Sequence, residues 1–151
     1  MSRIAGGATR RHFLKVLAAS ASLPVLANCG GPGGTAPAQV GDVPAGNVAD
    51  LPVGSLHALG SSPVCIGRDK NGVYAMTLTC THAGCNMAIN GNVSSSGVLC
   101  TCHGSRFDAD GNVQSGPAHS SLQHFAVSAD SAGNLTIHGG TKVSSGTRLE
   151  V

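Results

Sequence analysis

Six cysteines and seven histidines in 151 residues are the most informative chemical feature of this sequence. Four of the cysteines and two of the histidines fall in two short segments, Cys80-Thr81-His82-Ala83-Gly84-Cys85 and Cys100-Thr101-Cys102-His103-Gly104-Ser105. Each segment offers a thiolate and an imidazole at close spacing, as Cys-x-His in the first and Cys-x-x-His in the second. Two thiolates and two imidazoles suit either tetrahedral zinc or an iron–sulfur centre.

Each segment also contains one further cysteine, Cys85 in the first and Cys102 in the second. These two can bridge the segments by a disulfide, which is stable in an oxidising compartment. The bridge would close a loop of about 16 residues and stabilise the fold by about 3 kcal/mol. It would also fix the two segments against each other.

The residues around the two segments predict short strands. Aromatic residues make up only 3% of the chain, which contains 22 glycines and no tryptophan, so the core must use small and β-branched side chains. Asn71-Gly72, Asn90-Gly91 and Asp110-Gly111 predict tight turns. Strand-like runs lie at 56–59, 64–68, 73–79, 89–93, 98–99, 106–108, 122–128 and 135–138, with a weaker one at 148–151. We therefore expect an all-β, antiparallel domain of about 100 residues.

The N-terminal region is typical of an export signal. Arg10 and Arg11, followed by Phe13, Leu14 and Lys15, resemble a twin-arginine signal, and an uncharged run then extends from residue 16 to 27. The apolar part is about 12 residues long, whereas about 20 residues are needed to span a bilayer. The residues before Cys29 resemble a lipobox, which would make Cys29 a lipidation site, although a plain signal-peptide end with a free thiol fits the same residues.

We expect three parts in the chain: a signal over residues 1–29, a tether over 30–53, and the domain over 54–151. Residues 30–54 contain seven glycines and four prolines, a composition typical of a flexible linker. Four of the nine basic residues lie in the first 15 positions, and the remaining five face seven acidic residues. The basic excess therefore belongs to the signal, and the composition argues against binding to nucleic acid.

The two cysteine–histidine segments resemble those of Rieske iron–sulfur proteins, specifically the disulfide-bearing type found with cytochrome bc complexes. The resemblance covers roughly residues 51–151 and implies a small domain of stacked antiparallel sheets with two cluster-binding loops. It implies a 2Fe-2S cluster with Cys80 and Cys100 on one iron and His82 and His103 on the other, each histidine through Nδ1. It also implies that Cys85 and Cys102 form the disulfide.

The resemblance assigns tuning roles to residues outside the ligand set. Gly116 and Pro117 resemble the loop that covers the cluster in this family. Ser105 stands where family members carry a hydroxyl that donates to a cluster sulfur and raises the potential. Phe107 stands where members of high potential carry tyrosine, so we expect a potential below the top of the family range.

Other residues with reactive side chains have simpler interpretations. Cys65 lies inside an apolar strand and is expected to be a buried free thiol. His57, His124 and His138 lie on expected strands and are interpreted as surface or hydrogen-bonded histidines, and His119 as a solvated loop residue. We expect no catalytic nucleophile.

The expected function is one-electron transfer in an exported, membrane-associated redox chain on the periplasmic side of a bacterial cytoplasmic membrane. The expected partners are a cytochrome or another redox protein, the membrane surface and, in one setting, quinol. Alternative settings are the small subunit of an exported oxidase that resembles arsenite oxidase, and the quinol-oxidising subunit of a cytochrome bc complex. A structural zinc module is the remaining alternative.

Overall fold

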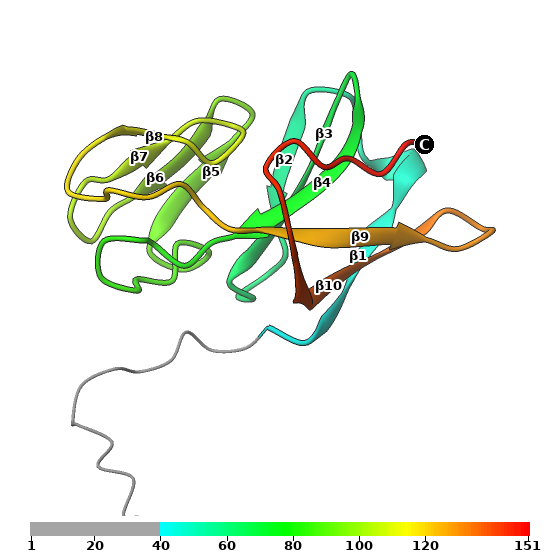
Figure 1. Ribbon diagram of the computed structural model, residues 1–151, viewed down its shortest axis with the longest axis horizontal. Coiled ribbons are helices and arrows are strands. Elements are labelled where there is room, and N and C mark those ends of the chain that lie inside the picture. The colour runs from blue at the N-terminus through cyan, green and yellow to red at the C-terminus, as the bar shows by residue number, and fades with distance from the viewer. Residues whose placement is uncertain (1–39) are drawn as a thin grey trace, which may run out of the picture. The chain divides into compact units, whose positions relative to one another are not determined.

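The computed structural model describes residues 40–151, which form two antiparallel sheets (Figure 1). The larger sheet has the strand order β1-β10-β9-β4-β3-β2, and the smaller has the order β5-β6-β7-β8. The strands are β1 (Asp42–Asn47), β2 (Ser55–Ala58), β3 (Val64–Asp69), β4 (Gly72–Thr77), β5 (Gly91–Ser94), β6 (Gly97–Cys100), β7 (Arg106–Phe107), β8 (Val113–Ser115), β9 (His124–Ala129) and β10 (Asn134–Val143). The predicted all-β fold of stacked antiparallel sheets is confirmed.

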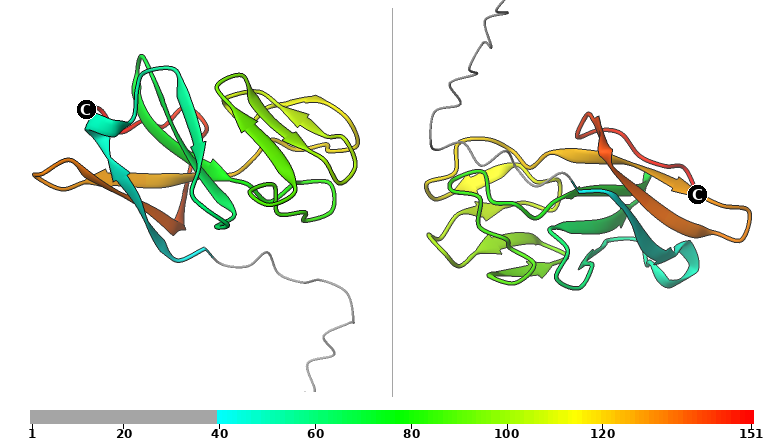
Figure 2. Two further views of the ribbon diagram at one scale, coloured as in Figure 1. Left: turned by 180° about the vertical axis from the view of Figure 1, so that it is seen from behind. Right: turned by 90° about the horizontal axis from the view of Figure 1, so that it is seen from below.

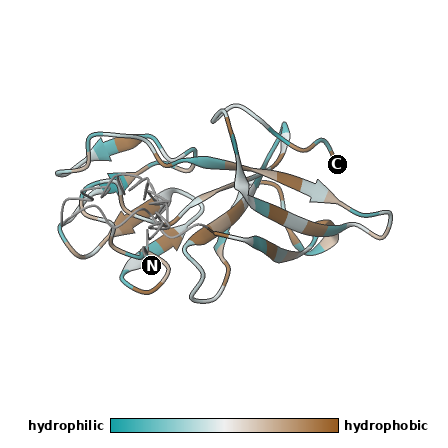
Figure 3. Ribbon diagram, turned by 60° about the horizontal axis from the view of Figure 1, so that its bottom comes forward, coloured by the Kyte–Doolittle hydropathy of each residue, from teal (hydrophilic) through white to brown (hydrophobic). Residues whose placement is uncertain are grey.

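Strand β4 is the centre of the larger sheet. All six of its residues are buried, because it pairs with β3 on one side and β9 on the other. Strand β10 alternates buried and less buried residues over its first half, as expected where one sheet face meets the core. Figure 3 shows the same alternation of apolar and polar residues along the strands.

The smaller sheet is an insertion between β4 and β9. It lies to one side of the larger sheet in all three views of Figures 1 and 2. An apolar cluster joins the two sheets, because Tyr74 and Met76 of β4 pack in the same core as Met87, Val98 and Phe107. A second cluster, built around Ile66, Val73 and Ile137, lies within the larger sheet. The larger sheet is thus the platform that carries the smaller one.

The predicted tether is wrong over its second half. Residues 42–47 form β1, which pairs with β10 through Asp42↔His138 and Val43↔Ile137, and a 3-10 turn follows at Val48–Asp50. Ala45 and Leu51 are buried in the core. β1 is an edge strand, which tolerates Pro44 because one side of it needs no ladder hydrogen bond. The signal, Cys29 and residues 30–39 lie outside the described residues.

Two further differences concern short elements. β8 was not predicted, because three residues carry too little apolar pattern to be recognised. The expected strand at 148–151 is reduced to one bridge between Leu149 and Val73. Within residues 40–151 there is no helix with the length and apolar character needed to cross a bilayer.

His124, at the start of β9, is buried rather than exposed. Its Nδ1 lies 3.3 Å from the carbonyl oxygen of Leu122, whereas its Nε2 has no hydrogen-bond partner among the described residues. Burial lowers the pKa of His124, and the nearby positive charge of Arg148 lowers it further, against the opposing effect of the Leu122 carbonyl. The fold therefore favours the neutral imidazole.

Acidification should weaken the fold through this histidine. In the unfolded chain His124 returns to an ordinary pKa of about 6.5, so the unfolded state binds more protons as the pH falls below that value. The free energy of unfolding then decreases, by at most about 1.4 kcal/mol per pH unit for one group. Urea unfolding of wild type and His124→Gln at neutral and mildly acidic pH measures this effect. His124→Gln should lose less stability on acidification than wild type, and the exposed-site control His57→Gln should lose as much as wild type. Equal acid sensitivity in all three proteins would contradict the prediction.

Candidate metal centre

The two cysteine–histidine segments form loops that are closed in the same way. The first follows β4, and the second joins β6 to β7. In each loop the N–H of the leading cysteine donates to the carbonyl five residues later, and the N–H four residues later donates back to the carbonyl of that cysteine. These bonds are Cys80 N to Cys85 O (2.9 Å) and Gly84 N to Cys80 O (2.8 Å), then Cys100 N to Ser105 O (2.8 Å) and Gly104 N to Cys100 O (3.0 Å).

A glycine at the fifth position of each loop makes this closure favourable. Gly84 has a φ of +73° and Gly104 a φ of +81°, in the left-handed region that other residues rarely adopt. The Cys-x-x-x-Gly spacing is therefore a backbone requirement as well as part of a donor motif. The two loops thus share one backbone closure, although their histidines follow the leading cysteine by two and by three residues.

The thiols and the imidazoles lie at different depths. Cys80 and Cys100 are 3% and 0% exposed, whereas His82 and His103 are exposed. The two imidazole rings are in contact, with their centroids 4.8 Å apart and their planes at 81°. The four predicted donors therefore divide into a buried sulfur pair and a solvent-facing nitrogen pair.

The buried pair has the electrostatics of a site that needs a cation. Burial raises the pKa of the Cys100 thiol, and the neighbouring Cys80 raises it further. Two thiolates at this depth would repel each other and lack solvation, unless a metal compensates their charge. The donor set thus fits a metal centre with mixed sulfur and nitrogen ligands.

A disulfide joins the loops between Cys85 and Cys102, which are 17 residues apart in sequence with Cα atoms 6.7 Å apart. The sulfurs of Cys85, Cys100 and Cys102 all lie within 4.8 Å of one another. Because Cys85 and Cys102 are joined in the disulfide, neither of them supplies a thiolate. The free cysteines of residues 40–151 are then Cys65, Cys80 and Cys100.

Cys65 lies outside the loops, on β3, and is a buried free thiol as predicted. Its sulfur contacts the carbonyl oxygen of Met76 at 3.6 Å, and burial raises its pKa to about 12. It therefore behaves as a small apolar core residue. The thiols in the loops remain Cys80 and Cys100.

A third loop, at residues 116–120, is tied to both cysteine–histidine loops. The N–H of Ala118 donates to Ser105 Oγ at 3.2 Å, and Thr81 Oγ1 donates to the carbonyl of Ser120 at 2.6 Å. Ser105 is fully buried, and because its oxygen accepts from Ala118 its own hydroxyl proton is left for another acceptor. Gly116 and Pro117 thus belong to a loop that lies against the donor site. We call residues 116–120 the proline loop.

Phe107 lies on β7, 3% exposed, in the same apolar cluster as Cys80 and Cys100. It pairs with Val98 and Val113 across the smaller sheet. Its side chain is part of the core that also contains the two thiols, and it offers no hydrogen-bond donor.

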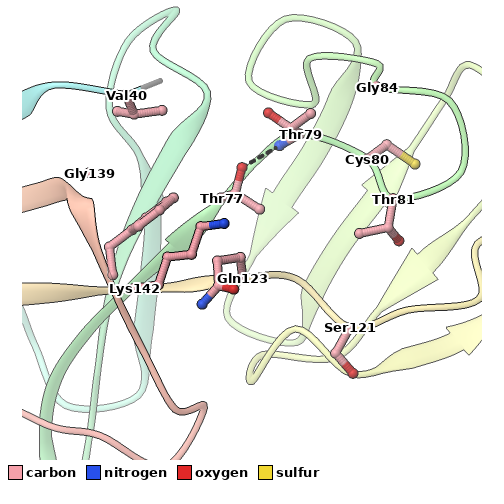
Figure 4. Close-up of a pocket in the computed structure, with 11 residues that line it drawn as sticks. Val40, Thr77, Thr79, Cys80, Thr81, Gly84, Ser121, Gln123, Gly139 and Lys142 are labelled. Atoms are coloured by element: carbon pink, nitrogen blue, oxygen red, sulfur yellow. Dashed lines mark hydrogen bonds between the residues drawn. The ribbon is translucent and has the colours of Figure 1, made fainter. Parts of the chain in front are cut away.

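A groove of about 330 Å³ lies beside the first loop (Figure 4). Its lining includes Cys80, Gly84, Thr77, Ser121, Gln123 and Lys142. His82 and His103 are not among the lining residues. The groove therefore belongs to the sulfur side of the site rather than to the imidazole side.

The sequence did not suggest one hydrogen-bonded group on the larger sheet. Ser128 Oγ lies 2.8 Å from His138 Nε2, and His138 Nδ1 lies 3.0 Å from Asp42 Oδ2. The side chains of His138 and Asp42 are 34% and 66% exposed, so this group is open to water. It joins three adjacent strands, β9, β10 and β1, and we interpret it as a brace of the sheet.

A family model, the Rieske 2Fe-2S domain, matches residues 40–126 of this chain. The chain belongs to the Rieske family. The match implies a 2Fe-2S cluster as the cofactor, and it begins at residue 40, just before β1. The Rieske domain therefore includes the residues that sequence reasoning had assigned to the end of the tether.

Similar proteins include iron–sulfur subunits of cytochrome b6-f complexes. The subunit of Synechococcus sp. (strain RCC307) is 37% identical over 108 residues, 66% of this chain and 60% of that subunit. The subunit of Prochlorococcus marinus (strain MIT 9211) is 31% identical over 118 residues, 72% of this chain and 65% of that subunit. The chain thus matches a little under two thirds of the length of these relatives.

Among solved structures, the cyanobacterial plasma membrane Rieske protein PetC3 from Synechocystis PCC 6803 is 30% identical, with a TM-score of 0.49. The similarity covers 63% of this chain and 97% of that chain.

Substitution of Gly116 should test how closely the proline loop approaches the Rieske site. Gly116 has a φ of +95°, and a Cβ there would lie 2.6 Å from the Cα of Ser105. Because both the conformation and the contact are unfavourable, Gly116→Ala should lower the free energy of unfolding by about 1–3 kcal/mol. Gly146→Ala, where a Cβ meets nothing within 4 Å, is the control. Thermal unfolding that shows the same stability for both variants would rule out this close approach.

Proposed function

We propose that this Rieske protein transfers single electrons through a 2Fe-2S cluster held by Cys80 and Cys100 on one iron and by His82 and His103 on the other. The main support for the proposal is that the two cysteine donors are buried whereas the two histidine donors are exposed. The thiols lie in the core, and the touching imidazoles lie at the surface, where a partner can reach them. When bound, the cluster supplies a site that accepts and releases one electron.

The ligand chemistry sets the range of the potential. Two neutral imidazoles in place of two thiolates remove negative charge, which makes the reduced state easier to reach. Such centres have potentials of about −150 to +300 mV, compared with about −400 mV for plant-type ferredoxins with four cysteines. An exposed imidazole also keeps an ionisable N–H, so gain of an electron should be coupled to gain of a proton at alkaline pH.

The surrounding residues tune this range. Ser105 is buried and accepts from the N–H of Ala118, and its unused hydroxyl proton supports a role as donor to a sulfur of the cluster. Phe107 lies in the same apolar cluster as the thiols and offers no donor. Gly116 and Pro117 lie in the proline loop, which is hydrogen-bonded to both cysteine–histidine loops. We infer a potential within the family range but below its top.

We propose that the protein works on the periplasmic side of a bacterial cytoplasmic membrane, in a respiratory or other redox chain. The twin-arginine-like segment around Arg10 and Arg11 supports export, and Cys29 would supply a lipid anchor that holds the domain at the membrane surface. The similarity to cytochrome b6-f subunits favours a cytochrome as the redox partner, with quinol as donor in that setting. If the protein is instead the small subunit of an exported oxidase, its partner is the large, metal-containing subunit of that enzyme. Identification of the proteins that copurify from the native membrane distinguishes the cytochrome partner from the oxidase partner.

Maturation of the N-terminus can be measured directly. Mass spectrometry of protein recovered from the membrane fraction should show a chain that begins at a diacylated Cys29. An unmodified N-terminal peptide would contradict the lipid anchor, and a protein confined to the cytoplasm would contradict export.

The ligand assignment predicts a sharp contrast between two buried cysteines. Cys80→Ser should abolish the red-brown colour and the rhombic electron paramagnetic resonance signal of the reduced protein, because it removes an iron ligand. Cys65→Ser, also at a buried free thiol, should keep both. His82→Ser should abolish the signal, and His57→Gln should keep it. A colourless wild type that binds zinc without iron and acid-labile sulfide would overturn the proposed function.

Phe107→Tyr should raise the reduction potential. A new hydroxyl at position 107, in the apolar cluster that contains the thiols, would donate to a sulfur, as the family resemblance implies. A hydrogen bond worth about 1 kcal/mol corresponds to roughly 40 mV for one electron. Redox titration followed by electron paramagnetic resonance measures the change. Phe107→Leu, which alters packing without adding a donor, is the control. If both variants shift the potential alike, or neither does, the hydroxyl at this position has no role.

A further inference from the structure

Arg148, beyond the end of β10, lies in an unusual position for a charged residue. Its side chain is only 9% exposed, and its guanidinium bridges two carboxylates, with Nε 2.7 Å from Asp69 Oδ2 and Nη2 2.6 Å from Asp110 Oδ1. Its Cζ also lies 4.2 Å from the centre of the Tyr74 ring, within the range of a cation–π contact. A nearly buried charge is retained only where it is paired in this way.

The two carboxylates belong to different sheets. Asp69 ends β3 of the larger sheet, and Asp110 lies in the β7–β8 loop of the smaller sheet. Although burial acts to raise it, the hydrogen bond from Arg148 and the amides of the turn lower the pKa of Asp69. The pair with Asp69 therefore stays ionised, and the guanidinium connects the platform to the sheet that carries the site.

The C-terminal segment that carries Arg148 is itself fixed on β4. The N–H of Val73 donates to the carbonyl of Leu149 at 2.9 Å, and the N–H of Leu149 donates to the carbonyl of Val73 at 2.8 Å. Nη1 of Arg148 donates to the carbonyls of Ser145 and Thr147. The guanidinium therefore has a defined position relative to the larger sheet.

The loop that Arg148 contacts is tightly organised. Tyr74 Oη donates to the carbonyl of Ala109 at 2.9 Å, next to Asp110. Asp108 Oδ1 accepts from the N–H groups of Asp110 and Asn112, at 3.0 and 2.8 Å. A displacement of Asp110 should therefore move residues 108–112 as a unit.

This unit leads directly to the proline loop. β8 follows at Val113–Ser115 and pairs with β7, and Gly116 comes next. Gly116 approaches the backbone of Ser105, and the N–H of Ala118 donates to Ser105 Oγ. A continuous path of bonded groups thus runs from Arg148 through Asp110 and β8 to the buried serine of the site.

We propose that Arg148 and Tyr74 are positioning residues that hold the proline loop against the metal centre through the β7–β8 loop and β8. The inference rests on the proposed function for the identity of the centre, but its mechanical part concerns the protein alone. Arg148 and its two partner carboxylates carry one net negative charge. Tyr74→Phe changes no charge and therefore separates an effect of loop position from a direct effect of charge on the centre.

The test compares four variants of the full, cluster-loaded chain with a matched control. Arg148→Met removes the bridge, Arg148→Lys keeps the charge without the planar fork, Asp110→Asn removes one carboxylate charge, and Tyr74→Phe removes only the bond to Ala109. Arg106→Met is the control, because Arg106 is an exposed cation of β7 that forms no ion pair within residues 40–151. It removes the same charge from the smaller sheet without touching the bridge.

Amide hydrogen exchange is the first measurement. Arg148→Met should raise the exchange rates of residues 108–118 at least tenfold, including the amides of Gly111 and Ala118, and leave those of β1 and β10 unchanged. Arg148→Lys should restore part of the protection. Tyr74→Phe and Asp110→Asn should act in the same direction with smaller effects, and Arg106→Met should have none. If Arg148→Met fails to fold, the Tyr74→Phe and Asp110→Asn variants carry the test.

The second measurement is the state of the centre. Arg148→Met should speed iron loss to a chelator several-fold and alter the line shape of the paramagnetic signal, whereas Arg106→Met should do neither. Faster exchange confined to residues 69–74 and 144–151, or spread evenly over the domain, would overturn the positioning role. If the chain holds zinc rather than iron, the proposed function fails, but the exchange data still decide whether Arg148 controls residues 108–118.

Discussion

Donor atoms from two separate loops can act on one metal centre only if the loops hold them in fixed relative positions. In this chain the backbone closes each loop by itself, through the same two hydrogen bonds and a glycine in the left-handed region. The disulfide between Cys85 and Cys102 then joins two loops that are each already closed. The position of the donors therefore depends on local backbone geometry and one covalent link, with little demand on the side chains themselves.

The depth of the donors follows from where each loop leaves its strand. Cys80 and Cys100 lie at or just beyond the end of a buried strand, so their sulfurs remain in the core, whereas His82 and His103 lie two and three residues further, at the surface. This arrangement leaves the two sulfurs almost without solvent exposure and the imidazoles accessible. The exposed imidazole edge allows contact with a redox partner, while the thiols stay in the core.

The sequence predicted those parts of the molecule whose geometry is set within a few residues. The two loops, the disulfide partners, the turn at Asn71-Gly72 and most strands have local signals. β1 was missed because Pro44 and Gly46 resemble a linker, although an edge strand accepts both. β8 was missed, and the strand expected at 148–151 proved to be a single bridge, because a few residues with one pairing partner carry no periodicity. The burial of His124 and the pairing of Arg148 with Asp110 depend on the packing of two sheets, which no local pattern encodes.

The contacts that hold the proline loop differ in kind from those that form the donor loops. Thr81 and Ser120 are 39 positions apart, Tyr74 and Ala109 are 35 apart, and Asp110 and Arg148 are 38 apart. Such long-range bonds need the complete platform, whereas the donor loops need only their own residues and the disulfide. The same two donor loops can therefore be combined with different covering loops. The long-range contacts that position the covering loop then set the reduction potential and the accessibility of the centre. In this chain those contacts converge on residues 108–120, and substitutions there should separate the tuning of the centre from its assembly.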